Sequence, residues 1–257
     1  CSIYEGPSQD KKEYFEIAKQ GLEKMYHLLK KHDAPATLFL EYVFAKRYPK
    51  LLNKFLDLNC EFALHCYNHD QKYATLPPAF SKKVLTTAKK ELETLFDVKI
   101  VGFRGPGMSA PSHNILKDIG IKYDSSLHPA FVPGYYNNYF SPRHIHTVDG
   151  IVEVPVSVFP CIRSPLSWLW FRNFGLTYAK LGTQLNALTS DYLNIYFHPW
   201  DFMDFTTLPY DYKLKNIMAR NSGDKTVTAL QSYIQWLLRK NYKTMTMHDY
   251  LRTKKLL

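Results

Sequence analysis

The sequence is poor in cysteine, and its four cysteines include no Cys-x-x-Cys pair. A disulfide framework or a thiolate zinc site normally depends on closely spaced cysteines, so neither is indicated. We therefore expect a reducing compartment, and a cytoplasmic location is favoured because the chain as given shows no signal peptide. Since the chain opens on Cys1 instead of Met, this expectation leaves the localisation open.

The sequence also lacks the long runs that mark a membrane span or a nucleic-acid-binding surface. No stretch of about 18 consecutive apolar residues occurs, so no transmembrane helix is predicted. No run interleaves basic with aromatic residues, which argues against nucleic acid as a partner. The net charge of +10 permits an anionic partner, but solvated helix faces over 11–31 and 82–90 account for much of it.

Apolar residues make up 46% of the 257 residues, which is enough for one large core. Repeats, low-complexity tracts and linkers are missing, so residues 1–257 are expected to form a single domain; no oligomeric state is indicated. A segment with three prolines and no periodicity, 128–150, is expected to be a long surface loop that could cover a site.

Short apolar runs alternate with longer amphipathic ones along the chain. The predicted strands cover 37–40, 61–65, 100–103, 121–123, 151–156, 193–197 and 243–247, and the predicted helices cover 43–58, 81–96, 112–119, 171–188 and 226–239. This alternation indicates parallel strands linked by helical crossovers. Seven or eight such units favour an α/β fold with a single distorted (β/α) barrel of seven or eight parallel strands over an open sheet.

Polar side chains follow five predicted strands, four of those above and a further one at 2–4, at the end where parallel barrels place their chemistry. They are Glu5, the pair His65 and His69, Arg104, Asp124 and His198. Each has an ordinary alternative as a terminal charge, an ion-pair partner, a turn cap or a packed histidine. Their recurrence at equivalent strand ends is what indicates a site.

The two histidines in Glu61-Phe-Ala-Leu-His65-Cys-Tyr-Asn-His69 are the clearest candidate metal ligands. Neutral imidazole suits zinc, copper, iron or nickel. A catalytic zinc usually keeps three protein ligands and one open position, so the pair needs a third donor, often a carboxylate. By itself, a pair with this spacing is more often two unconnected polar residues.

Together, these residues resemble the polysaccharide deacetylase family, whose members share the NodB homology domain, over nearly the whole chain. His65-Cys-Tyr-Asn-His69 is similar to the family's second motif, His-[Ser/Thr]-x-x-His, with Cys66 in place of the hydroxyl residue. Arg104-Gly-Pro-Gly107 resembles its third motif, Arg-x-Pro-Tyr, with Gly107 in place of the aromatic residue.

The later motifs continue the resemblance. Asp124 in Tyr-Asp-Ser-Ser is similar to the aspartate of the fourth motif, and Tyr196-Phe-His198 matches the last motif, which has a hydrophobic residue two places before histidine. The extension His198-Pro-Trp-Asp201 resembles a common variant within the family.

The first motif departs from the family pattern. Thr-Phe-Asp-Asp-Gly-Pro becomes Ser2-Ile-Tyr4-Glu5-Gly6-Pro7, so Glu5 takes the place of the metal-binding aspartate and Tyr4 that of the general base. A tyrosine with its ordinary pKa near 10 is a poor base at neutral pH. Three explanations stay open: residues are missing between Ile3 and Tyr4, which we favour, Glu5 serves as the base, or deacetylation has been lost.

The resemblance implies a metal-dependent hydrolase that removes the acetyl group from an N-acetylated amino sugar. It implies a divalent metal, with zinc favoured over cobalt, nickel or iron, held by His65, His69 and Glu5. An acetylated carbohydrate is then the expected partner. Trp168 and Trp200 are candidate substrate-binding residues because aromatic faces stack on sugars, although core packing accounts for aromatic residues equally well.

The resemblance also implies the catalytic roles. His198, held protonated by Asp124, would protonate the departing amine, and Arg104 would position a carboxylate base such as Glu5. The metal and a backbone N–H near Gly107 would hold the oxyanion and bind the substrate. Two alternatives remain: an amidase acting on a small amide, as in allantoinase-like relatives, and a catalytically impaired relative that only binds carbohydrate.

Overall fold

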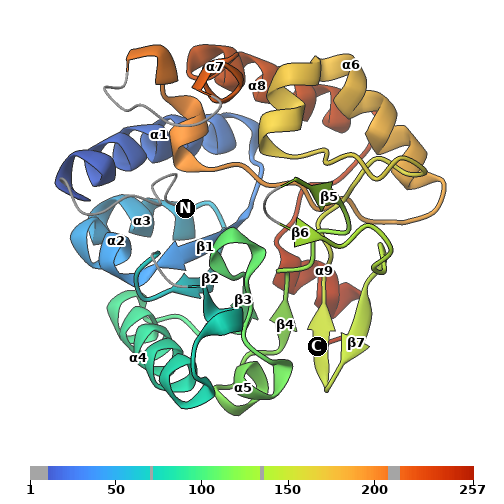
Figure 1. Ribbon diagram of the computed structural model, residues 1–257. Coiled ribbons are helices and arrows are strands. Elements are labelled where there is room, and N and C mark those ends of the chain that lie inside the picture. Colours follow the sequence, from blue (N-terminus) through green and yellow to red (C-terminus); the bar gives the residue numbers. More distant parts are fainter. Residues whose placement is uncertain (1–10, 70–71, 134–135, 208–214) are drawn as a thin grey trace.

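The computed structural model describes residues 11–69, 72–133, 136–207 and 215–257 (Figure 1). The helices are α1 (Lys11–His32), α2 (Tyr42–Arg47), α3 (Pro49–Leu56), α4 (Pro78–Phe96), α5 (His113–Asp118), α6 (Trp168–Ala187), α7 (Lys215–Ala219), α8 (Asp224–Arg239) and α9 (Met247–Thr253). The strands are β1 (Thr37–Glu41), β2 (Glu61–Cys66), β3 (Gly102–Phe103), β4 (Tyr123–Asp124), β5 (Phe131–Val132), β6 (Tyr136–Asn137), β7 (His146–Val148) and β8 (Ile151–Glu153). Short 3-10 turns include η2 (Pro106–Met108) and η3 (Pro199–Phe202). No helix among these residues is long and apolar enough to cross a bilayer.

The main sheet confirms the predicted α/β class. Its strand order is β1-β2-β3-β4-β8-β7, with a separate β5–β6 pair. Strands β1, β2, β3, β4 and β8 pair in parallel, as the alternation of strands and helices predicted. The described strands form an open order, so they do not by themselves close the expected barrel.

The antiparallel pairing of β7 with β8 differs from the expected all-parallel arrangement. Asp149 and Gly150 form the two-residue connection, with φ of 52° and 82°. Two consecutive left-handed residues give a hairpin turn whose twist suits the flanking strands, and Asp-Gly is a strong sequence signal for such a turn. The segment 128–150, predicted as a loop, therefore ends in half of a hairpin.

The predicted strand 193–197 is not a regular strand in the structure. Its carbonyl groups accept hydrogen bonds from irregular neighbours: Asn194 O from the N–H of Ser157 at 2.8 Å, and Tyr196 O from the N–H of Trp168 at 3.1 Å. Residues 243–246 are likewise outside any strand. Both predictions of a regular strand were wrong, because an apolar pattern does not by itself provide a neighbouring strand to pair with along the whole segment.

The predicted helix 43–58 is broken into α2 and α3 at Pro49. Proline has no backbone N–H and disfavours the helical conformation of the residue before it, and Tyr48 accordingly has φ −126° and ψ 49°. The other helices lie close to their predicted positions. In Figure 1, α2, α3 and α4 lie along one side of the sheet, while α1, α6 and α8 lie above it.

Strand alternation separates the two faces of the sheet. Phe62 of β2 packs on Phe96 of α4, with ring centroids 4.9 Å apart, which defines the outer, helix-covered face. Glu61 points to the opposite, inner face, where its Oε1 accepts a hydrogen bond from the Tyr123 hydroxyl at 2.7 Å. Because side chains alternate along a strand, His65 lies on the inner face with Glu61.

Candidate functional site

The strand register determines which side chains meet at the carboxyl edge. Leu64, Phe103, Asp124 and Glu153 lie side by side across β2, β3, β4 and β8. The residue after each of these points to the other face of the sheet. His65 and Arg104 therefore share the inner face, while Asp124 lies on the outer face.

The structure places the two candidate metal ligands together. The rings of His65 and His69 have centroids 5.2 Å apart. Nδ1 of His65 contacts the backbone oxygen of Arg104, so a metal ion would be bound through the other ring nitrogen, Nε2. Burial holds the pKa of both imidazoles well below the ordinary value, so both are neutral at pH 7 and able to donate a lone pair. Glu5 lies outside the described residues.

Glu41, at the end of β1, is a carboxylate at this edge that the sequence analysis missed. It is buried, and its Oε1 accepts a hydrogen bond from the backbone N–H of His69 at 3.3 Å. The register between β1 and β2 shifts at Leu40 and Glu41, where the chain bulges. Glu41 directly follows the predicted strand 37–40, so the pattern that indicated the other site residues, a polar residue directly after an apolar strand, also indicates Glu41.

Arg104 is buried on the inner face and held by neutral groups. Nε donates to the carbonyl of Ser125 at 2.9 Å, and Nη2 donates to Ser125 Oγ at 2.7 Å and to Asn194 Oδ1 at 3.2 Å. The guanidinium also lies over the rings of Phe39 and Tyr196, at 4.5 and 5.3 Å. Burial lowers the pKa of Arg104 to about 10, so the group stays cationic at neutral pH.

His198 stands at the start of η3 and is buried. Its ring stacks on Trp200, with centroids 4.4 Å apart and planes at 6°, and meets Trp168 edge-on at 5.0 Å. The two tryptophans expected to bind substrate thus hold this imidazole. Burial lowers the pKa of His198, and the nearby carboxylate of Asp201 opposes that shift.

The expected pairing of Asp124 with His198 is not formed. Asp124 Oδ1 accepts from Ser126 Oγ at 2.6 Å, and Oδ2 lies 3.7 Å from Nε2 of His113 in α5. The carboxylate beside His198 is Asp201 instead, with Oδ2 3.4 Å from Nδ1. The reason is the alternation described above, which points Asp124 away from the inner face.

His113, Asp124 and Glu153 form a compact group on the outer face. Their ligand atoms all lie within 4.8 Å of one another, close enough to hold a metal ion. Hydrogen bonds to the two carboxylates raise the pKa of His113 to about 10, and burial together with Asp124 raises that of Glu153 to about 7. A protonated His113 between the carboxylates therefore already satisfies this group electrostatically.

One cavity of about 1450 Å³ joins the residues of the inner face. Its lining includes Glu41, His65, His69, Arg104, Gly107, Trp168, Trp200 and His198. Val132 and Tyr136, from the segment predicted to cover the site, line it too. Gly107 has φ 58° in η2, the left-handed region that favours glycine, which explains the absence of an aromatic side chain there.

A parallel α/β sheet with imidazoles, an arginine and a carboxylate around a cavity at its carboxyl edge is the arrangement of an α/β enzyme. The polysaccharide deacetylase family model matches residues 10–123, which include His65, His69 and Arg104 but end before Asp124 and His198. A search of curated proteins found no match.

Solved structures share the fold over most of the chain. A candidate polysaccharide deacetylase from Mycobacterium smegmatis has a TM-score of 0.63 at 20% identity, covering 94% of this chain and 80% of its own. PuuE allantoinase has a TM-score of 0.62 at 17% identity, with 93% and 73% covered. A CE4-family pseudoenzyme from Bacillus anthracis has a TM-score of 0.53 at 17% identity, and the match covers 90% of this chain and 60% of the pseudoenzyme chain. The resemblance to the polysaccharide deacetylase family is confirmed over residues 10–123, and the solved structures share the fold over the rest of the chain.

Proposed function

We propose that this protein is a metal-dependent hydrolase that removes the acetyl group from an N-acetylated amino sugar. The observation that carries the proposal is the placement of two neutral imidazoles, His65 and His69, on the same cavity as His198. The match of residues 10–123 to the polysaccharide deacetylase family model supports this reaction class.

The donor set fits a divalent metal. His65 engages the Arg104 carbonyl through one ring nitrogen, which fixes its tautomer and directs the other nitrogen, as outer partners do in metal sites. His65 and His69 would hold the ion together with a carboxylate, for which Glu5 is the candidate from the first motif. When bound, such an ion, with zinc favoured, would supply the Lewis acidity that hydrolysis of an amide needs.

The protein's own groups would complete the proton transfers. A carboxylate is needed to accept the proton of the attacking water, and Glu41 supports this role besides Glu5 because it is buried on the same cavity. His198 would give a proton to the departing amine. The backbone N–H near Gly107 would face the oxyanion, and Arg104 would add positive charge to the same cavity.

The test is acetate release from N-acetylated chitooligosaccharides by the protein loaded with zinc or cobalt. Release that disappears in the His198→Ala variant, with metal content unchanged, supports the proposal. Binding of the oligosaccharides without release would identify a carbohydrate-binding relative instead. Allantoin in the same assay tests the small-amide alternative, and turnover of allantoin alone would overturn the amino-sugar proposal.

A further inference from the structure

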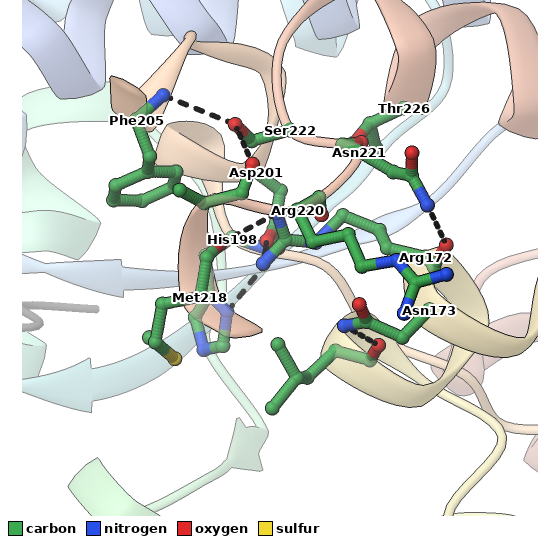
Figure 2. Close-up of polar contacts among 12 residues, drawn as sticks. Arg172, Asn173, His198, Asp201, Phe205, Met218, Arg220, Asn221, Ser222 and Thr226 are labelled. Atoms are coloured by element: carbon green, nitrogen blue, oxygen red, sulfur yellow. Dashed lines mark hydrogen bonds and ion pairs between the residues drawn. The ribbon is translucent and has the colours of Figure 1, made fainter. Parts of the chain in front are cut away.

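A buried ion pair stands directly behind His198 (Figure 2). Arg172 of α6 and Asp201 of η3 have fully buried side chains, with Nη2 3.2 Å from Oδ1. The second carboxylate oxygen, Oδ2, lies 3.4 Å from Nδ1 of His198 and accepts the backbone N–H of His198 at 2.8 Å. Each oxygen of Asp201 thus serves a different partner.

A buried ion pair is weak evidence for stability. The desolvation of two charges offsets much of their attraction, and well-packed apolar residues of similar volume are often at least as stable. The placement of this pair against His198 therefore suggests a role beyond holding the fold together.

Arg172 is itself fixed from behind. Its Nη1 donates to the carbonyl of Met218 at 3.0 Å and to that of Arg220 at 3.4 Å (Figure 2). Its own backbone oxygen accepts from Nδ2 of Asn221 at 2.9 Å. The guanidinium is anchored between α6 and the segment before α8, so it presents a stationary cation to Asp201.

Asp201 is fixed by the same segment. The backbone N–H of Gly223, at the start of α8, donates to the Asp201 carbonyl at 3.0 Å. Thus the carboxylate is held from its backbone, from Arg172 and from the His198 backbone. With Trp200 stacked on the imidazole, His198 has little freedom to rotate.

The negative charge of Asp201 Oδ2, 3.4 Å from Nδ1, favours the tautomer that carries its proton on that nitrogen. Nε2 is then left to face away from Asp201, where it can exchange a proton with a substrate. Among the described residues, the charged and titratable groups around His198 are Asp201 of η3, Arg172 of α6 and Tyr196, whose ring centroid lies 5.4 Å from that of His198, with His65 and His69 of the β2 edge nearby.

We propose that Asp201, held in place by Arg172, is the positioning residue of His198 and fixes its tautomer. The effect of Asp201 on catalysis rests on the proposed deacetylase function. Its effect on the tautomer of His198 does not. The proposal assigns to the aspartate of His-Pro-Trp-Asp the role that the sequence analysis expected of Asp124.

The variant Asp201→Asn tests the proposal with little change of shape. Arg172 has only donors, so it would bind the amide oxygen and leave the amide NH₂ facing Nδ1. Nδ1 must then act as an acceptor, and the proton moves to Nε2. Proton-coupled ¹⁵N spectra of the imidazoles, with His198 assigned from His198→Gln, should show the Nδ1–H tautomer in the wild type and the Nε2–H tautomer in the variant.

The kinetic expectation is a fall in kcat on the order of 100-fold or more, with KM and metal content nearly unchanged. The falling limb of the kcat profile should also move to lower pH, because the carboxylate that raised the pKa of His198 is lost. Arg172→Lys keeps the positive charge but loses the forked guanidinium group, so its kcat should fall less than that of Asp201→Asn. Asp118→Asn, at an exposed ion pair with Lys82, is the matched control and should match the wild type.

An unchanged His198 tautomer in the folded Asp201→Asn variant would overturn the proposal. A fall in kcat without a shift of the falling limb of the pH profile would also overturn the proposal, because that pattern reflects a general loosening of the fold. If the wild type releases no acetate, the deacetylase proposal fails while the ¹⁵N spectra still decide the positioning role.

Discussion

Gly21 of α1 lies against the backbone of Pro199, the residue that follows His198. A Cβ atom at position 21 would come within 1.8 Å of the Pro199 oxygen. Backbone cannot yield as a flexible side chain can, so glycine is what permits α1 to approach η3. The first helix of the chain thus supports the late imidazole through a contact between residues 178 positions apart in sequence.

Replacing Gly21 with alanine should displace η3 and His198. We expect a loss of about 1–3 kcal/mol in the free energy of unfolding from overpacking, despite the better helix propensity of alanine. Chemical denaturation measures this loss. Gln20→Ala, on the exposed neighbour, is the control and should be neutral or slightly stabilising. Equal stability of the two variants would show that α1 and η3 separate without cost.

The metal ligands are tested by removing both imidazoles. The double variant His65→Ala/His69→Ala should purify without bound zinc, because two of the proposed ligands are gone, while each single variant should bind more weakly. Elemental analysis after dialysis against zinc measures this. His27→Ala, an exposed histidine of α1, should keep the full metal content. Metal retained in the double variant would move the site elsewhere, with His113, Asp124 and Glu153 next to be tested.

Glu41 is tested with the isosteric variant Glu41→Gln. The amide oxygen can still accept the N–H of His69, so the fold should be kept, but the group can no longer take a proton. We expect kcat to fall on the order of 100-fold or more with metal content unchanged, as for loss of a general base. An unchanged kcat would leave Glu5 as the base.

Much of the fold could be predicted from the sequence, because its periodic signals are local. Short apolar runs predicted β1 and β2, and amphipathic periodicity predicted α4 and α8. What could not be predicted depended on partners distant in sequence. The segment 193–197 has the pattern of a strand but bonds to irregular chain near Ser157, which no local pattern reveals.

The site shows the same division. The sequence predicted that polar residues at strand ends lie together, and His65, Arg104 and His198 do line one cavity. Sequence order alone could not tell which face each residue takes, since a one-residue shift at a strand end reverses it. That is why Asp124 was paired with the wrong histidine and Asp201, three residues after His198, was not considered as its partner.

The group on the outer face makes stability depend on pH. His113 has its pKa raised from 6.5 to about 10, so its contribution is fully present below pH 6.5 and is lost as the pH rises through about 10. Glu153 has its pKa raised from 4.5 to about 7, so the folded protein keeps a proton that the unfolded chain releases. Both shifts make stability fall as pH rises, Glu153 between 4.5 and 7 and His113 between 6.5 and 10.

His113→Gln should therefore separate from the wild type mainly at acidic pH. At pH 5 the wild type has the whole contribution of the raised His113 pKa, and the variant loses all of it. At pH 8, between 6.5 and 10, part of that contribution is already lost from the wild type, so the substitution removes less. We expect thermal unfolding to show a larger difference in Tm at pH 5 than at pH 8, with Asn114→Ala, an exposed neighbour, matching the wild type at both. A difference in Tm that is the same at the two pH values would mean that His113 contributes packing and not charge.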